Sequence, residues 1–255
     1  MAGRTPRLRG HGAGARLCGG DPLGALLLRL IGTAPQLEWL ARMGLDYDAS
    51  ILDVGCGAGV LLRELRRDGF RNLRGIDPFI AGDLDLGCGV RVHRRGLDAH
   101  DGRHDLVMLH HSLEHMPDQP GVFGHLRRLV RPGGWLLIRI PVADSLAWRE
   151  YGVDWVQLDA PRHFYLHTRR SLDRLAGGAG FARRRLEHDS TGFQFWGSEQ
   201  YRRDVPLHDP RSELSRPDRS LFGRGALAEF ERRARALNVS GEGDQAVFFY
   251  QAPSD

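Results

Sequence analysis

The sequence contains no lysine, so all 36 of its basic residues are arginine, and asparagine occurs only at Asn72 and Asn238. We attribute both features to coding bias in a GC-rich genome. The formal net charge is only +4, because 32 acidic residues are interleaved with the arginines. A nucleic-acid surface would need clustered basic charge with stacking aromatic rings. The densest basic run, Arg183 to Arg185, is explained by the solvated start of a strand, so we expect no nucleic-acid partner.

Cysteine is scarce and long apolar runs are absent. The three cysteines, Cys18, Cys56 and Cys88, show no C-x-x-C spacing, which favours a reducing compartment and argues against a structural zinc or a disulfide framework. No stretch approaches the roughly 20 apolar residues that a membrane span needs. Arg29 interrupts the apolar run 23–31, which could be mistaken for part of a signal peptide. We therefore expect a cytoplasmic protein without a membrane partner, as a monomer or a homodimer.

The length and the order of segments suggest one α/β domain with additions. A chain of 255 residues can bury one full α/β core. Residues 1–20, rich in arginine and glycine, are expected to be a flexible tail. Residues 21–48 should carry two helices, one from Asp21 and one from Pro35 to Met43, which either cap the site or pack on the sheet edge. The domain would span 49–255, with an insertion at about 189–245 whose aromatic residues form a core, a lid or a dimer contact.

The chain is organised around residues 51–62. A short buried strand, Ile51 to Val54, runs into glycines at positions 55, 57 and 59 and then into a helix. Such a turn brings backbone close to a ligand and points free N–H groups at it, so it usually holds a nucleotide-like cofactor. A dinucleotide fingerprint would need its third glycine at Val60. Asp53 adds little beside a pyrophosphate but suits the sulfonium and ammonium groups of S-adenosylmethionine.

The pattern Asp53-x-Gly55-x-Gly57-x-Gly59 resembles the first motif of class I S-adenosylmethionine-dependent methyltransferases. A helix over 120–130, a Pro-Gly-Gly turn and a strand over 135–140 are a second signature of that family. The resemblance covers about residues 50–190 and extends less closely to the C-terminus. It implies a Rossmann-like, mostly parallel sheet of seven strands with an antiparallel last strand, in three α/β/α layers. It also implies S-adenosylmethionine as the cofactor.

The resemblance and the position of polar residues at strand ends predict the cofactor contacts. Asp77 ends the second strand, 22 residues after Gly55, where an acid can accept hydrogen bonds from both ribose hydroxyls. Asp77-Pro78 could instead form a turn. Asp98 falls where the family approaches the adenine, although a solvated loop acid would also fit. The predicted cofactor-binding residues are Asp53, Gly55, Cys56, Gly57, Gly59, Asp77, Pro78, Leu97, Asp98 and His110.

Two polar segments should lie on the acceptor side. His110 to Asp118 follow a buried strand over 105–109 and end in the Glu-His pair typical of the family. The gap of four between His111 and His115 suggests a metal, but no third ligand is obvious, so we predict none. Segment 151–167 resembles the Asp-x-Pro-Arg-His stretch of a bacterial subgroup associated with small molecules and saccharides. It would form the lip of a substrate pocket or a structural clamp, and the candidate substrate residues are His115, Trp155, Arg162 and Tyr165.

Methyl transfer to an alcohol or phenol requires that the acceptor lose its proton, which a histidine can take. His111 and His163 are the first candidates for this base, followed by His115 and His167, although each could be a structural histidine. The sequence thus predicts a methyltransferase acting on a small-molecule acceptor, by O-methylation of a saccharide or secondary metabolite. The alternatives are a nicotinamide-dependent oxidoreductase and a binding module that holds S-adenosylmethionine without catalysis.

Overall fold

The computed structural model describes residues 35–215 and 221–254. These residues fall into two compact units. The first unit comprises residues 35–112, 120–137 and 251–254, and the second comprises 113–119 and the described part of 138–250. The expected tail over 1–20 and the expected helix from Asp21 lie outside the described residues. Among the helices of the described ranges, none is both long and apolar enough to span a bilayer.

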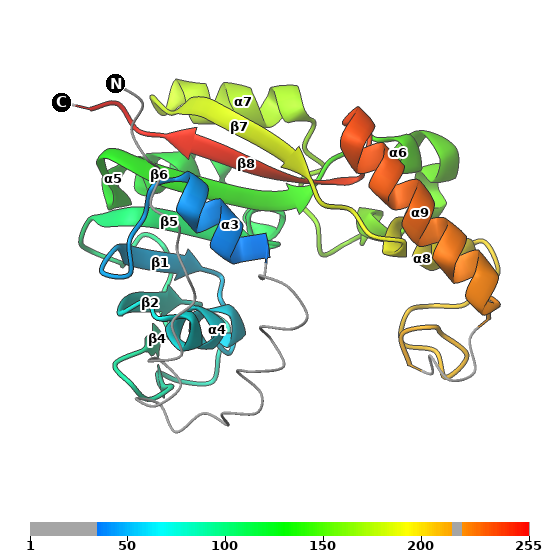
Figure 1. Ribbon diagram of the computed structural model, residues 1–255, viewed down its shortest axis with the longest axis horizontal. Coiled ribbons are helices and arrows are strands. Elements are labelled where there is room, and N and C mark those ends of the chain that lie inside the picture. Colours follow the sequence, from blue (N-terminus) through cyan, green and yellow to red (C-terminus); the bar gives the residue numbers. More distant parts are fainter. Residues whose placement is uncertain (1–34, 216–220, 255) are drawn as a thin grey trace. The chain divides into compact units, whose positions relative to one another are not determined.

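The sheet has eight strands in the order β3-β4-β2-β1-β5-β6-β8-β7. In the first unit β1 runs parallel to β2 and β5, β2 runs parallel to β4, and only β3 is antiparallel to its neighbour β4 (Figure 1). The predicted Rossmann-like, mostly parallel fold is confirmed, with one strand more than expected, because residues 84–85 fold back on β4. The strands that begin in this unit are β1 (Ser50–Val54), β2 (Asn72–Ile76), β3 (Leu84–Asp85), β4 (Arg91–His93), β5 (His104–His110) and β6 (Val130–Pro141).

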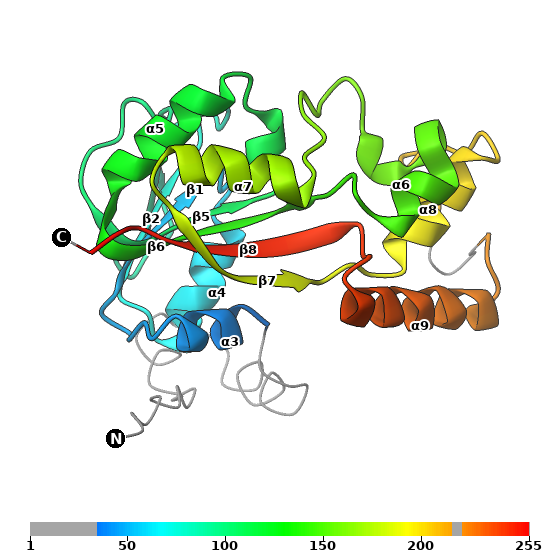
Figure 2. The same ribbon diagram turned by 90° about the horizontal axis from the view of Figure 1, so that it is seen from above.

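Helices cover both faces of these strands. Figure 2 shows α3 (Pro35–Arg42) and α4 (Val60–Asp68) on one side and α5 (Gln119–Leu129) on the other. Helix α4 buries Leu62 and Leu65 and ends at Gly69, whose left-handed backbone caps it. The expected helix Pro35 to Met43 is confirmed as α3.

The second unit contains the end of β6 and the elements that follow it. Figure 1 shows β8 running opposite to β6 and β7, which confirms the antiparallel last strand. Thr168 caps α7, because its hydroxyl accepts a hydrogen bond from the backbone N–H of Ser171. The helices and strands are α6 (Leu146–Tyr151), α7 (Arg169–Gly178), β7 (Ala182–His188), α8 (Phe193–Tyr201), α9 (Arg224–Ser240) and β8 (Gln245–Gln251); short 3-10 turns span Leu113–His115, Gly152–Asp154 and Val156–Leu158.

The Pro-Gly-Gly segment is a correction to the sequence analysis. It is part of β6, which begins at Val130, and does not form a turn before a strand at Trp135. The backbone N–H of Gly133 donates to the carbonyl of Pro253, and the N–H of Ala252 donates to the carbonyl of Gly134. The C-terminal segment thus supplies a hydrogen-bonding partner, which the local turn residues do not reveal.

A disulfide is a second correction. Cys56 is a free thiol, whereas Cys88 is disulfide-bonded. The sequence analysis argued against a disulfide framework from cysteine count and spacing. The bond at Cys88 shows that cysteine count and spacing alone do not exclude a single disulfide.

Candidate functional site

The glycine turn between β1 and α4 is built from three left-handed residues. Gly55, Gly57 and Gly59 have φ angles of 73°, 53° and 70°. A methyl group on Gly55 would lie 2.5 Å from Cβ of Ser112, and one on Gly59 would lie 2.6 Å from Cδ1 of Leu86. At Gly57 no heavy atom lies within 4 Å of that position. Gly55 and Gly59 are therefore required by packing, while Gly57 faces open space from which a ligand can approach the backbone.

This difference predicts unequal stability losses. Alanine at either position pays about 1–2 kcal/mol for the left-handed backbone, but alanine at Gly55 adds an overlap worth about 1–3 kcal/mol. We expect urea unfolding to show the larger loss for Gly55→Ala and the smaller one for Gly57→Ala. Adding Ser112→Gly to Gly55→Ala should restore part of the loss. Equal losses for the two single variants would contradict the packing assigned to Gly55.

Asp77 holds the turn from the end of β2. Its Oδ2 accepts a hydrogen bond from the backbone N–H of Gly57 at 2.9 Å, and its Oδ1 accepts one from the N–H of Phe79 at 2.8 Å. The bond to Phe79 is the turn that the sequence analysis kept as an alternative. Each carboxylate oxygen retains a second lone pair, so this arrangement leaves acceptors for the two ribose hydroxyls.

Asp53 lies beside the turn in a setting that needs a cation. Its side chain is 3% exposed, and its buried Oδ1 accepts no hydrogen bond from residues 35–215 or 221–254. Burial, followed by the nearby charge of Asp77, raises the pKa of Asp53 to about 7. A buried carboxylate without a donor is costly. The ammonium and sulfonium groups of S-adenosylmethionine supply the missing charge, so these residues fit that cofactor.

The raised pKa of Asp53 predicts a pH-dependent stability. The folded chain keeps a proton up to about pH 7 that the unfolded chain loses near its ordinary pKa of about 4, so this group's contribution falls as the pH rises between those values. From pH 5 to pH 8 the free energy of unfolding should fall by roughly 3 kcal/mol on this account. Asp53→Asn should remove that part of the fall in urea unfolding, and Asp85→Asn, at an exposed site, should not. An unchanged pH dependence in Asp53→Asn would contradict the assignment.

The remaining predicted cofactor-binding residues of the first unit differ in burial and in hydrogen bonding. The Cys56 thiol donates to the carbonyl of Gly57, and burial raises its pKa to about 12, so it stays protonated and is no nucleophile. Pro78 is exposed beside Asp77, and Leu97 is half-buried. Asp98 is exposed, and its carbonyl accepts a hydrogen bond from Arg128. The adenine contact proposed for Asp98 and the solvated-acid alternative both stay open.

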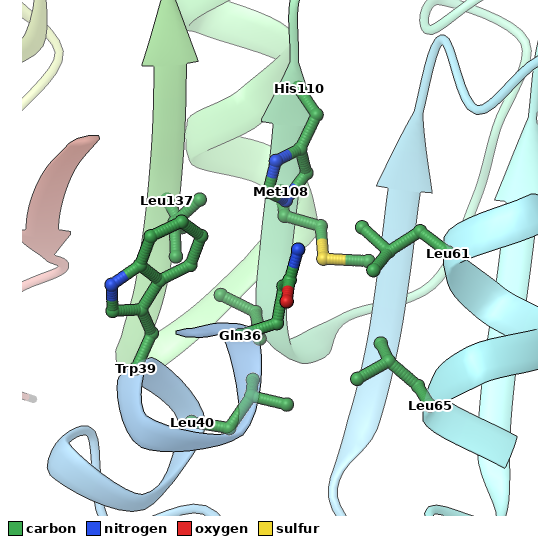
Figure 3. Close-up of a pocket in the computed structure, with 9 residues that line it drawn as sticks. Gln36, Trp39, Leu40, Leu61, Leu65, Met108, His110 and Leu137 are labelled. Atoms are coloured by element: carbon green, nitrogen blue, oxygen red, sulfur yellow. The ribbon is translucent and has the colours of Figure 1, made fainter. Parts of the chain in front are cut away.

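His110, the last residue of β5, borders an apolar pocket in the first unit. Figure 3 shows Trp39 and His110 on opposite elements around it. Their rings are stacked, with centroids 6.3 Å apart and planes 19° apart. The sequence analysis missed Trp39, because no motif fixes how helix α3 meets the sheet. The pocket is lined by Gln36, Trp39, Leu40, Leu61, Leu65, Leu106, Met108, His110 and Leu137.

His111 follows directly in an uncommon backbone conformation. Its φ is 50°, which is rare for a residue with a side chain and often marks a functional site. The next residue, Ser112, donates its hydroxyl to the carbonyl of Val54 at 2.8 Å and is the nearest neighbour of Gly55. His111 is therefore one residue from the glycine turn's packing partner.

In the second unit the fold brings together residues 48 positions apart in the chain. Glu114, His115 and His163 each offer a ligating atom within 4.8 Å of those of the other two. Nδ1 of His115 lies 2.9 Å from the carbonyl of Arg162, and Nδ1 of His163 lies 2.9 Å from the carbonyl of Gln157. Since a carbonyl only accepts, both Nδ1 atoms carry the proton. Burial lowers the pKa of His163, which favours the neutral ring with its lone pair on Nε2.

The other residues predicted for the substrate are placed differently. Trp155 is a correction: it has no exposed surface, its Nε1 donates to Asp244 at 2.9 Å, and it packs with Tyr151 and Phe195 in the core of the second unit. Trp155 therefore has the structural role that was the alternative to lining the substrate pocket. Its partner Phe195 shows that part of the aromatic cluster in 189–245 belongs to a core.

The two other residues are at the surface. Arg162 is exposed and paired with Asp159, and the exposed Tyr165 donates its hydroxyl to the carbonyl of Pro117.

Known proteins resemble this chain in sequence and in fold. The profile of the methyltransferase domain family matches residues 30–185, more than half of the chain. Proteins named ubiquinone biosynthesis O-methyltransferase are 30% identical over 135 residues in Sodalis glossinidius and 33% identical over 150 residues in Bordetella avium. These alignments cover 48% and 52% of this chain and 54% and 61% of those proteins. The chain thus spans somewhat more than half the length of the curated relatives it matches.

A solved S-adenosylmethionine-dependent methyltransferase from Mesorhizobium loti has a TM-score of 0.51, covering 86% of this chain and 98% of that one. At 16% identity this likeness shows the fold alone. The family match and the glycine turn agree with it. The chain therefore belongs to the methyltransferase domain family, with the class I fold whose cofactor is S-adenosylmethionine.

Proposed function

We propose that the protein transfers a methyl group from S-adenosylmethionine to an oxygen atom of a small molecule, a saccharide or a secondary metabolite. The observation that carries the proposal is the buried Oδ1 of Asp53, which has no hydrogen-bond donor among the described residues and lies beside a glycine turn open at Gly57. The names of the curated relatives support oxygen as the acceptor atom. The saccharide or metabolite acceptor rests on the Asp-x-Pro-Arg-His resemblance of residues 159–163.

The residues of the first unit would have different roles in the reaction. When bound, S-adenosylmethionine supplies an electrophilic methyl group on a positively charged sulfur. Asp53 balances the positive charge, and Asp77 accepts hydrogen bonds from the ribose while its bond to the N–H of Gly57 holds the turn in shape. A histidine would take the proton of the acceptor hydroxyl as that oxygen receives the methyl group.

We propose His111 as that base, with His163 as the alternative. His111 belongs to the same unit as the glycine turn, one residue from Ser112, and its backbone is held in a left-handed conformation. A strained residue persists only where its surroundings enforce it, which is typical of residues that must present a side chain in one direction. The protein therefore aligns donor and acceptor and removes one proton, which is the main task in a displacement of this kind.

The proposal is tested by binding and by turnover. Calorimetric titration should show S-adenosylmethionine binding and no binding of NAD, because a dinucleotide would meet Val60 where its motif needs glycine and Asp53 beside its pyrophosphate. A mass-spectrometric screen over phenols, saccharides, amines and carboxylates should then show the gain of one methyl on a hydroxyl. NAD binding would favour the oxidoreductase alternative. Binding of S-adenosylmethionine without turnover on any acceptor would favour the inactive module.

A further inference from the structure

We propose that Glu114, His115 and His163 bind one divalent transition-metal ion, with zinc as the representative ion. The sequence analysis considered a metal at His111 and His115 and set it aside for want of a third ligand. The fold of the second unit supplies different companions for His115. One is its neighbour Glu114, and the other is His163, from the segment that follows α6.

The three side chains are gathered in a sheltered place. Glu114 is 1% exposed and the His163 side chain is 7% exposed. Their ligating atoms and that of His115 lie within 4.8 Å of one another. Two ligands on a zinc ion, each about 2.0–2.1 Å from it, are roughly 3.3 Å apart. The separations in the cluster exceed that spacing by at most about 1.5 Å.

The hydrogen bonds behind the two rings are an independent sign of a metal site. Metal-binding histidines almost always donate their other ring N–H to a carbonyl or carboxylate, which fixes the tautomer and the direction of the ring. His115 and His163 both do this, through Nδ1, to the carbonyls of Arg162 and Gln157. The N–H of Phe164 also donates to the carbonyl of Glu114 at 2.9 Å. The backbone segments that carry Glu114 and His163 are therefore hydrogen-bonded to each other beside the cluster.

The neighbouring side chains His167 and Asp159 do not take the place of Glu114, His115 or His163 as ligands. His167 is close enough to Glu114 to feel its charge, but its Nε2 lies 3.2 Å from Oε1 of Gln119 and its Nδ1 3.4 Å from the hydroxyl of Ser171. Asp159 Oδ2 is 3.7 Å from Nε2 of His163, beyond hydrogen-bond distance, and its Oδ1 is engaged by Arg162. The cluster therefore offers two imidazoles and one carboxylate.

This donor set selects the class of ion. Imidazole nitrogen suits zinc, iron and similar ions, whereas magnesium and calcium prefer oxygen ligands. Two histidines and one glutamate form a known kind of zinc site, which keeps a fourth position for an oxygen ligand. An ion there lowers the pKa of a bound hydroxyl. The binding of the ion does not depend on the proposed function.

The test is a zinc titration of the full chain after removal of metals with a chelator. Calorimetry with zinc chloride alone should show one site per chain, and magnesium chloride alone should show none. His163→Ala should weaken zinc binding by about a hundredfold or more, because loss of a ligand costs at least as much as loss of its hydrogen-bonding partner. Glu114→Gln, which keeps the size of the side chain, should act in the same direction. His208→Ala, at an exposed histidine outside the cluster, should bind as the unaltered chain does.

The outcomes separate this inference from the proposed function. Absence of zinc binding to the unaltered chain, or equal affinity in folded His163→Ala and Glu114→Gln, overturns the metal site. So does a preference for magnesium. S-adenosylmethionine binding and methyl transfer are measured on the same preparations. Methyl transfer without zinc binding would remove only the metal site, and zinc binding without methyl transfer would remove only the proposed function.

Discussion

Replacing His111 with asparagine is expected to lower kcat for methyl transfer by about 10²–10⁴-fold, the usual contribution of a general base. The affinity for S-adenosylmethionine should stay within about twofold, because the residue acts on the acceptor. Asparagine is the better substitution because it tolerates the left-handed backbone that His111 adopts, with φ 50°. Any loss of activity is then due to the missing imidazole and not to a changed backbone at position 111.

The pH profile of the rate separates a base from a structural role. In an enzyme that uses a general base, kcat rises with pH as the base loses its proton and then levels off. In His111→Asn that rise should disappear. His125→Ala, a half-buried histidine on α5, serves as the control and should keep both the rate and the profile. If His111→Asn retains the rate and the rise with pH, the base is another group, and His163→Gln is the next variant to measure.

Features that short-range rules determine were predictable from the sequence. The sequence predicts a helix directly after the three glycines, and α4 spans Val60–Asp68 with Gly69 as its cap. Thr168 caps α7 in the same local way. In these cases glycine and threonine mark the ends, and apolar spacing marks the buried face. The turn around Asp53, Gly55 and Gly57 was predictable for the same reason, because strand, glycines and helix are contiguous.

Features that depend on distant segments were not predictable. Trp155 has the composition expected of a pocket wall, yet Asp244, 89 residues further on, receives its N–H and the ring is buried. The Pro-Gly-Gly segment reads as a turn until Pro253 and Ala252 pair with it. His115 and His163 are separate motifs in the sequence and meet only in the fold. No local pattern in a single sequence shows which distant strands and loops become neighbours in the fold.

Asp77 differs from these residues, because a local position and a long-range contact combine in one side chain. Its Oδ1 forms the short-range turn with Phe79, while its Oδ2 reaches back over 20 residues to the N–H of Gly57. The first bond follows from Asp-Pro in the sequence, and the second exists only because β1 and β2 are adjacent and parallel. The geometry therefore links the shape of the glycine turn to the acid proposed to hold the ribose.

Replacing Asp77 with alanine should therefore weaken S-adenosylmethionine binding by well over tenfold. Two charge-assisted hydrogen bonds to the ribose are worth about 1.5–3 kcal/mol each, and each 1.4 kcal/mol corresponds to about tenfold in affinity, so a loss on the order of a hundredfold is reasonable before the turn itself relaxes. Asp85→Ala is the matched control, because Asp85 accepts the same kind of local bond, from the N–H of Gly87 at 2.9 Å. Calorimetry on both variants decides the matter: if Asp77→Ala binds within twofold of the unaltered chain, the carboxylate only shapes the loop and does not hold the cofactor.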